Sequence, residues 1–440
     1  MDIHLLSLDW LMENAGPIIR WRVGNELLPE ISESQRDLLT RELLATPLVQ
    51  IWLGRLNLEE FSIPLDSLNT SSLGQLGGMV HGSKKNCLEN VLGKLSEFGL
   101  CAGMAGLDER VLPLFRIFRW KADWKSDDTF QNAGETLVKS VFAWGLLRMG
   151  YTPDSAMQDF LLEHLRNCHK IAHDQVFDIY ADEAELVGLP KAWAGKPIIK
   201  QEVMANYWLP YIHDLYVFTN FPASLLDKNT NRMIDDLITY ILDPRFQALR
   251  NGYGYAWIKE RNTCYSWGWS PHLKDDATLV QRVELMMHFP RGQSSTWVLE
   301  TLRFLDGFRT PEARYRLPGE YLREAEGYYV SGYGMGLGEN RRKSTGIEAE
   351  STFRMLKIQS LDKPCLLNYQ KEEQCPPNLS PRADCLAACA WIAWSTGFAM
   401  ATDAPAASAP GSGTLNTVKI RTCARNLTVH PEGWQSQVPG

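Results

Sequence analysis

The chain has 440 residues, against roughly 150 for an average domain, so its length allows about three domains or one large repeat-built fold. Hydrophobic residues make up 45% and charged residues 22%, which excludes an intrinsically disordered chain. The 45 basic and 52 acidic side chains give a net charge of −7 without a basic tail or stripe, so we expect no nucleic-acid partner. The chain has 15 Trp, 15 Tyr and 16 Phe, and the tryptophans exceed what packing alone usually needs, so an aromatic-lined cavity is one interpretation.

The cysteines and the chain start point to a reducing compartment. The nine cysteines are odd in number, scattered and without a CxxC pair. The N-terminal sequence MDIHLLSLDWLMENAG has no basic region and no clear cleavage site, so we expect no signal peptide and a cytoplasmic protein. The most apolar segment, 385–400, is shorter than the ~20 residues of a membrane span, and we therefore predict none.

Helical periodicity recurs along the chain. Between Leu88 and Leu100, for example, apolar residues fall at the i, i+3, i+4, i+7 spacing of an amphipathic helix. The same criterion predicts helices at 36–52, 88–100, 107–119, 136–149, 155–168, 231–242, 277–289, 294–306, 345–358 and 384–400. Strand-like alternation is scarce. We predict an all-α fold of helical hairpins in a barrel-like α/α toroid, although no strict repeat period supports the closure of the ring.

Three long segments interrupt this helical pattern. Residues 60–86 are rich in Gly, Ser and Asn, and residues 244–276 and 310–344 are rich in Gly and aromatics. Long loops of this kind often carry function. Residues 401–416 are an Ala/Ser/Pro/Gly stretch typical of a flexible linker. We therefore expect one toroid-like domain over 1–400 and a low-complexity tail over 401–440.

A first candidate metal site follows the helix predicted at 155–168. Asp174, Asp178 and Asp182 recur every four residues, which would place three acids on one face of a helix. Carboxylate oxygens on one face are a plausible Mg²⁺ site, and the alternative is a solvated acidic face.

The segment 251–276 combines aromatic rings with charged groups. Its aromatic residues are Tyr253, Tyr255, Trp257, Tyr265, Trp267 and Trp269, and its charged residues include Lys259, Lys274, Asp275 and Asp276. Aromatic faces stabilise cations, so rings beside metal-binding and diphosphate-binding groups would suit a carbocation reaction. A sugar-binding platform needs similar rings, and plain packing is a third interpretation.

A Gly-rich turn at 332–338, GYGMGLG, leads into three basic residues, Arg341, Arg342 and Lys343. The glycine spacing matches neither a dinucleotide-binding fingerprint nor a P-loop. Backbone amides at the start of the next helix together with arginine side chains would bind a phosphate or diphosphate. The alternative is a solvated basic turn.

Four stretches resemble a family of fungal and bacterial helical proteins known as squalene-cyclase-like or α/α-toroid proteins. They are LDWLMENAGPIIRWRV near the start, PYIHDLYVFTNFP at 210–222, YGYAWIKERNTCYSWGWSPHL at 253–273 and GYYVSGYGMGLGENRRKSTGIEAESTFRMLKI at 327–358. This family includes the non-canonical humulene synthases, which lack the DDxxD motif and ionise farnesyl diphosphate with Mg²⁺. DDxxD is also absent here. Those enzymes use a lysine near the diphosphate, but the corresponding helix reads ELMMHFP at 284–290, so Lys274 or Lys259 would have to replace it.

The resemblance implies a terpene cyclase that turns a prenyl diphosphate into a humulene-type sesquiterpene, as a monomer or homodimer. Lys274, Arg341 and Arg342 would act on the diphosphate. The implied Mg²⁺ ligands are Asp174, Asp178, Asp275 and Asp276. The implied substrate-binding residues are Lys259, Lys343, Tyr211, Tyr253, Trp257, Trp267, Trp269, Leu285 and Met286.

Two other classes of function remain open. The first is an intracellular carbohydrate-active toroid, in which paired carboxylates such as Glu348 and Glu350, or Asp275 and Asp276, serve as acid and base. The second is a non-catalytic helical-repeat protein that binds a peptide on a concave face.

Overall fold

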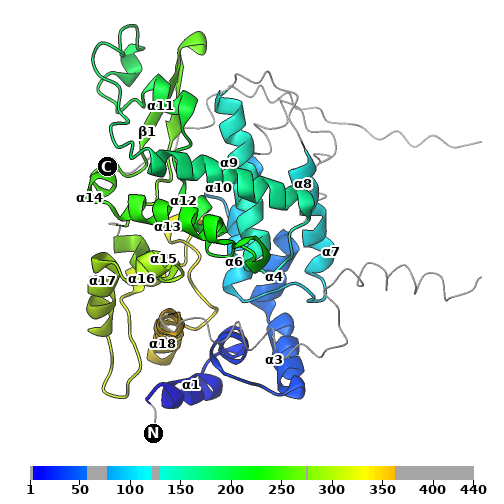
Figure 1. Ribbon diagram of the computed structural model, residues 1–440. Coiled ribbons are helices and arrows are strands. Elements are labelled where there is room, and N and C mark those ends of the chain that lie inside the picture. Colours follow the sequence, from blue (N-terminus) through cyan, green and yellow to red (C-terminus); the bar gives the residue numbers. More distant parts are fainter. Residues whose placement is uncertain (1–2, 57–76, 121–128, 274–275, 362–440) are drawn as a thin grey trace, which may run out of the picture. The chain divides into compact units, whose positions relative to one another are not determined.

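The computed structural model describes residues 3–56, 77–120, 129–273 and 276–361. The chain divides into two compact units, Met1–Lys363 and Pro364–Gly440, and the second lies entirely outside the described residues. So do the helix predicted at 384–400 and the tail predicted at 401–440. The first unit is mostly helical with one two-stranded sheet, which confirms the all-α prediction at that level (Figure 1). The toroidal closure stays a prediction.

The described α-helices fall into two runs along the chain (Figure 1). The first comprises α1 (Ile3–Asn14), α2 (Pro17–Arg22), α3 (Glu33–Ala45), α4 (Pro47–Arg55), α6 (Leu88–Glu97), α7 (Asp108–Val111), α8 (Arg116–Arg119), α9 (Thr129–Arg148) and α10 (Ser155–His173). The second comprises α11 (Gln201–Asn206), α12 (Ile212–Phe218), α13 (Lys228–Leu242), α14 (Pro244–Gln247), α15 (Leu279–Met287), α16 (Pro290–Gln293), α17 (Thr296–Asp306) and α18 (Ser344–Ser360). Helix α10 packs on α13, and α9 packs on α12.

Prolines break two of the predicted helices. The helix predicted at 36–52 is two helices, because Thr46 is extended and Pro47 begins α4. A proline ring lacks the N–H that a helix interior needs, but it is well suited to the first helical turn. The helix predicted at 107–119 is likewise divided into α7, a 3-10 helix at Leu112–Phe115 that contains Pro113, and α8. The apolar spacing therefore located helical residues correctly, but the prediction of one continuous helix in each of these two ranges was wrong.

The predicted aromatic loop contains a β-hairpin. Strands β1 (Gly254–Ile258) and β2 (Thr263–Trp267) pair antiparallel, with Gly254 opposite Trp267. Asn262 adopts a left-handed conformation (φ 48°) between them, which asparagine tolerates better than most residues. Aromatic residues alternate with smaller residues in this segment, which is the period-2 pattern of a strand. The prediction of a loop here was therefore wrong for the residues of β1 and β2.

Helix α6 lies inside the protein. Every residue from Leu88 to Glu97 is buried, including Glu89, Lys94 and Glu97. The helix contacts α4, α9 and the 3-10 helix Tyr329–Ser331. Because a buried charge is costly unless it is paired, each charged side chain of α6 needs a partner inside the fold.

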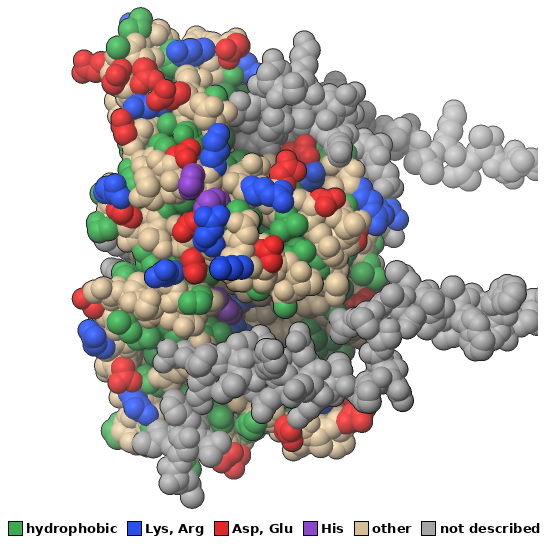
Figure 2. Space-filling model, in the orientation of Figure 1, with side chains coloured by type: hydrophobic (Ala, Val, Ile, Leu, Met, Phe, Trp, Pro, Cys, Tyr) green, Lys and Arg blue, Asp and Glu red, His purple; other side chains and the backbone are tan. Residues whose placement is uncertain are grey.

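The outer surface carries mixed charges. On the face shown in Figure 2, basic and acidic side chains are interspersed rather than segregated by sign. Among the described helices, none combines the length and the apolar character required to cross a bilayer.

The packing of α6 makes a testable prediction about glycine. A Cβ added at Gly93 would lie 2.5 Å from the ring of Tyr329, whereas one added at the exposed Gly54 in α4 would meet nothing within 4 Å. We therefore expect Gly93→Ala to lower the free energy of unfolding by about 1–3 kcal/mol through overpacking. Gly54→Ala should raise it by about 0.5–1 kcal/mol, because alanine loses less backbone entropy in a helix. Urea unfolding of both variants measures the two effects. A change of the free energy of unfolding in the same direction for both variants would contradict this packing.

Candidate functional site

A cavity of about 320 Å³ lies where α2, α6, α9, α12, α15 and α18 meet. Its charged lining residues are Arg22, Glu26, Glu97, Arg148, Glu284 and Lys357. Its uncharged polar lining includes Asn25, Ser96, Thr219, Asn220, Gln281 and the exposed ring of His288. Leucines and the rings of two tyrosines complete the wall. The wall of the cavity is therefore strongly polar.

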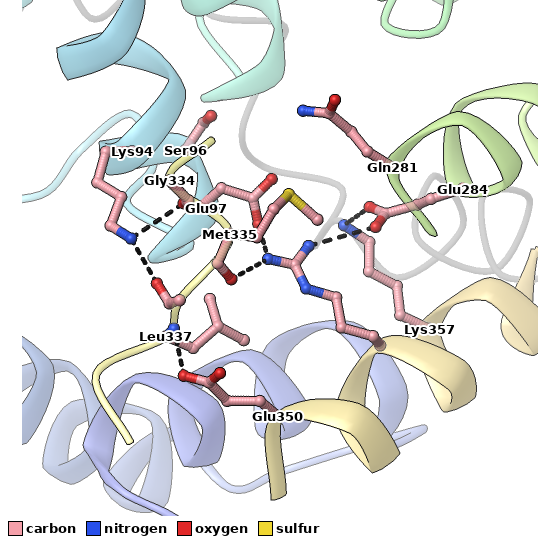
Figure 3. Close-up of polar contacts among 12 residues, drawn as sticks. Lys94, Ser96, Glu97, Gln281, Glu284, Gly334, Met335, Leu337, Glu350 and Lys357 are labelled. Atoms are coloured by element: carbon pink, nitrogen blue, oxygen red, sulfur yellow. Dashed lines mark hydrogen bonds and ion pairs between the residues drawn. The ribbon is translucent and has the colours of Figure 1, made fainter. Parts of the chain in front are cut away.

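Glu97, near the end of α6, is the centre of the charged wall. Its carboxylate is 2.7 Å from Arg354 Nη2, 2.6 Å from Arg148 Nη2 and 3.4 Å from Arg22 Nη1. It also accepts a hydrogen bond from the Tyr329 hydroxyl. Figure 3 shows Glu97 and Glu284 on either side of a guanidinium group, which the ion pairs identify as that of Arg354.

Glu284 and Glu26 extend this arrangement. Glu284 Oε2 is 3.3 Å from Arg354 Nη1, and Glu284 Oε1 is 2.7 Å from Lys357 Nζ. Lys357 Nζ is also 3.6 Å from Glu26 Oε2, and Arg22 Nε is 2.6 Å from Glu26 Oε1. We call this set the ion-pair network; it comprises Arg22, Glu26, Glu97, Arg148, Glu284, Arg354 and Lys357. Its four cations outnumber its three carboxylates, so its net charge is positive.

The carboxylates of the network are ionised at neutral pH. Burial alone would raise the pKa of Glu97, but Arg354, Arg148 and Arg22 outweigh it and hold that pKa well below its usual range. Burial would likewise raise the pKa of Glu284, but Lys357 and Arg354 outweigh burial and lower that pKa to about 2. None of these carboxyl groups carries a proton that it could donate near pH 7.

Three aromatic rings lie behind the charged wall. Trp144 is 5.3 Å from Tyr216 and 5.0 Å from Tyr329, measured between ring centroids, and both tyrosines line the cavity. The Tyr216 hydroxyl and Gln281 Oε1 are buried and have no hydrogen-bond partner among the described residues. Since buried polar atoms normally have partners, these two atoms are available to a bound ligand.

The predicted phosphate-binding turn has a different role. Lys94 Nζ donates hydrogen bonds to the carbonyl oxygens of Gly334 and Gly336 (Figure 3). The amide of Leu337 donates to Glu350 Oε1 at 2.7 Å. The Arg341 guanidinium donates to Glu350 and to the carbonyl of Leu322. Arg341, one of the donors that the hypothesis assigned to phosphate, is therefore occupied within the protein.

The other predicted cationic residues are not brought together. Arg342 and Lys343 are exposed at this turn. Lys259 is exposed on the hairpin segment, with its ammonium group 5.1 Å from the Trp257 ring centroid. Lys274 lies outside the described residues. None of the described members of this set lines the cavity.

The predicted metal ligands also lie apart. Helix α10 ends at His173, so Asp174 and Asp178 do not share a helical face, and that expectation was wrong. Asp174 accepts a hydrogen bond from the Tyr207 hydroxyl, and Asp178 accepts one from Lys200. Asp275 lies outside the described residues, and Asp276 begins the 3-10 helix Asp276–Thr278.

The predicted aromatic wall is mostly core. Trp257 belongs to a small cluster with Ile198 and Cys264. The other four rings pack within or against the main core and do not line the cavity; they are Tyr211, Tyr253, Trp267 and Trp269. Of the two residues predicted on the following helix, Leu285 lines the cavity and Met286 is fully buried in the core.

The carboxylates suggested for sugar chemistry have internal partners. Glu348 binds Arg314 and Arg316. Glu350 accepts from Leu337 and Arg341, as described above. Neither side chain lines the cavity.

A scan against models of protein families, a search of curated proteins and a search of solved structures found no match to this chain.

The network predicts a loss of stability in acid. The pKa values of Glu97 and Glu284 are lower in the folded state than the value of about 4.3 expected when unfolded. Their contribution to stability is complete above that value and is lost as pH falls toward the folded pKa. We expect the urea midpoint to fall steeply between about pH 4.5 and pH 2. Glu284→Gln should flatten this part of the curve, and an unchanged slope would contradict the assignment.

Proposed function

We propose that the protein is a Mg²⁺-dependent terpene cyclase that ionises a prenyl diphosphate in the cavity. The single observation that carries the proposal is the ion-pair network, which places an excess of positive charge around ionised carboxylates at the wall of a polar cavity. The same proposal takes the helical hairpins to form an α/α toroid, and the protein to act in the cytoplasm as a monomer or homodimer. The thiols of Cys87, Cys101, Cys168 and Cys264, all free, are compatible with a reducing compartment.

The diphosphate would lie against the cations that reach the cavity. Arg148 and Lys357 both line it, and their side chains retain 13% and 14% of their accessible surface. Charge-assisted hydrogen bonds from guanidinium and ammonium groups are among the strongest that a phosphate oxygen accepts. They would stabilise the negative charge that develops on the leaving group.

A magnesium ion would bind through two carboxylates, in exchange for the ion pairs that these groups now form with Arg22, Arg354 and Lys357. Glu26 and Glu284 both line the cavity, and Lys357 and their arginine partners lower the pKa of each against the effect of burial. Ionised carboxylates are the protein ligands that Mg²⁺ prefers, usually together with substrate phosphates. A magnesium ion held there would neutralise charge on the departing diphosphate.

Aromatic rings are also available for the carbocation. Tyr216 and Tyr329 line the cavity, in place of the rings predicted from the 253–273 segment. Their faces would stabilise an allylic cation, and Leu285 would contact the prenyl chain.

The segments that carry the family resemblance support this location. The first contains Arg22, the second contains Tyr216, and the stretch 327–358 contains Tyr329, Arg354 and Lys357. All five residues belong to the cavity wall or the ion-pair network. Three of the four resembling segments therefore meet at one place, which is expected if that place is the site they share with the cyclases.

The experiment is incubation of the purified full-length protein with geranyl, farnesyl or geranylgeranyl diphosphate, with Mg²⁺ or with EDTA. The readouts are gas chromatography of the extract and a pyrophosphate assay. A Mg²⁺-dependent hydrocarbon with matching pyrophosphate release is the expected result. No pyrophosphate from any of the three substrates would overturn the proposal.

The polar lining favours one alternative, a carbohydrate-directed enzyme. Asn25, Asn220, Gln281 and His288 are suited to hydroxyl groups more than to a hydrocarbon chain. Glycoside hydrolysis needs a carboxylic acid with a raised pKa, however, and the pKa values of Glu97 and Glu284 are lowered. A phosphorylated sugar, which also needs cations, fits this cavity better than a neutral glycan. Thermal stabilisation by sugar phosphates without pyrophosphate release would favour this alternative.

A further inference from the structure

A second group of polar side chains converges at the N-terminal end of α6, whereas Glu97 lies at the C-terminal end of this helix. It consists of His81, in the turn before α6, Glu89 in the first turn of α6, and His213 in α12. Glu89 and His213 are completely buried, and His81 is 4% exposed. The ring centroid of Trp269 is 4.1 Å from that of His81, and the Tyr328 ring stacks on it at 4.9 Å. Aromatic rings therefore shield the group.

The ligand atoms of these residues converge on one point. His81 Nδ1 contacts Glu89 Oε2, and His213 Nε2 is 3.3 Å from the same oxygen. One ligand atom from each residue lies within 4.8 Å of the others. Two ligands bound to one metal ion at about 2.0–2.1 Å are themselves separated by about 3.0–3.4 Å. The 3.3 Å between His213 Nε2 and Glu89 Oε2 is of that size, whereas His81 Nδ1 lies closer to Glu89 Oε2 and would have to move away from it when a metal ion binds.

The hydrogen bonding of this group is incomplete. Among the described residues, His81 Nε2 and both ring nitrogens of His213 are buried and have no hydrogen-bond partner. His81 Nδ1 contacts Glu89 Oε2, whereas His213 Nε2 lies 3.3 Å from the same oxygen without a hydrogen bond to it. Because an unpaired buried polar atom is costly, the position of His213 Nε2 favours a bound ligand between it and Glu89.

A neighbouring cluster shows the contrast. His164, Cys168 and Asp214 are also buried and close together. Asp214 Oδ2 accepts hydrogen bonds from Trp208 Nε1 and from the Tyr211 amide, both at 2.8 Å, and Oδ1 is 2.8 Å from His164 Nε2. His164 Nε2 and both carboxylate oxygens are therefore paired within the protein, whereas His164 Nδ1 has no hydrogen-bond partner among the described residues. Because the nitrogen that faces the carboxylate is paired here, this cluster is explained as a structural network.

We propose that His81, Glu89 and His213 bind a divalent transition-metal ion of the zinc class. Two imidazole nitrogens and one carboxylate form a ligand set typical of zinc and non-haem iron, whereas Mg²⁺ prefers oxygen ligands throughout. The site is thus distinct from the magnesium ion of the proposed reaction and does not depend on it. Three protein ligands leave a further position for water.

The ion would link the two helices that carry the cavity. Helix α6 supplies Glu89 and, about 12 Å further along its axis, Glu97. Helix α12 supplies His213 and, one turn later, Tyr216. Because the metal would tie α6 to α12 beside the cavity, its removal should lower thermal stability whether or not the protein turns over a prenyl diphosphate.

The test uses the full-length protein after dialysis against a chelator. Isothermal titration calorimetry with ZnCl₂ is expected to show one bound ion per chain, and the thermal midpoint is expected to rise by several degrees, with no such effect of MgCl₂. Co²⁺ should give a visible absorption band that reports nitrogen and oxygen ligands. An unmodified protein that binds neither Zn²⁺ nor Co²⁺ and shows no thermal shift would overturn the proposal without the need for any variant.

Matched histidine variants locate the site. His213→Gln and His81→Gln should abolish the Zn²⁺-induced shift, whereas His169→Gln, on α10 and paired with Asp236, should retain it. Circular dichroism of the three variants without metal checks that they fold alike. Retention of the full shift in both His213→Gln and His81→Gln would place the metal elsewhere and reject this assignment.

Discussion

Replacing Glu97 with Gln is expected to lower the free energy of unfolding by about 3–5 kcal/mol, which is the range for breaking a buried ion pair by removing one partner. The reason is the position of Glu97 at the centre of the ion-pair network. Its side chain is 1% exposed and contacts the guanidinium groups of Arg354, Arg148 and Arg22. Glutamine keeps the size of the side chain but leaves Arg354 and Arg148 without the carboxylate nearest to them. Urea and thermal unfolding of the full-length variant provide the measurement.

An exposed glutamate serves as the control. Glu300 lies on α17 at the surface, and Glu300→Gln should change the free energy of unfolding by no more than about 0.5 kcal/mol. Glu97→Gln combined with Arg354→Met should recover part of the loss, because the pair is then removed together. Equal stabilities of Glu97→Gln and Glu300→Gln would show that the network is not buried as described.

The positions of several helices could be predicted from the sequence, but the points at which helices end could be predicted only in part. Apolar spacing located α6, α10, α13 and α18, because a helix that packs on a core must repeat its apolar face. Pro47 is a helix-breaking residue, but the apolar spacing continues on both sides of it. The apolar spacing alone therefore predicted one helix where the structure has two. The β-hairpin was missed because short strands need tertiary partners, and their pattern was attributed to an aromatic loop.

The candidate site was missed for a physical reason. Charged residues on an amphipathic helix usually mark a solvated face, so Glu97 and Lys94 on α6 gave no signal of function. Helix α6 is buried on every side, and burial of this kind depends on contacts between segments that are distant in sequence. Arg354 and Lys357 lie one turn apart on the helix predicted at 345–358, and this spacing is the signal that could have indicated a polar helix face. The basic turn at 341–343 drew attention instead because its charges are consecutive.

Lys357 and Lys343 allow the two versions of the site to be compared directly. The sequence predicted Lys343 as a substrate-binding residue, whereas the structure places Lys357 at the cavity and leaves Lys343 exposed. If the diphosphate lies in the cavity, Lys357→Met should weaken the binding of inorganic pyrophosphate with Mg²⁺ by about 10- to 100-fold, since a hydrogen bond to a charged group contributes about 1.5–3 kcal/mol. Lys343→Met removes the same charge and should leave the affinity within about twofold, because an exposed charge is screened by solvent.

Isothermal titration calorimetry on the two variants decides between these sites. Lys357→Arg should restore much of the affinity, because the positive charge is kept next to Glu284 and Glu26, while thermal midpoints show whether a variant is merely unfolded. If Lys343→Met weakened the binding of pyrophosphate and Lys357→Met did not, the diphosphate would bind at the basic turn 341–343 instead of in the cavity. Because Lys357 and Glu284 form a direct 2.7 Å ion pair, a cation at this position is needed both for the network and for the ligand, and only the affinity measured on a folded variant separates the two roles.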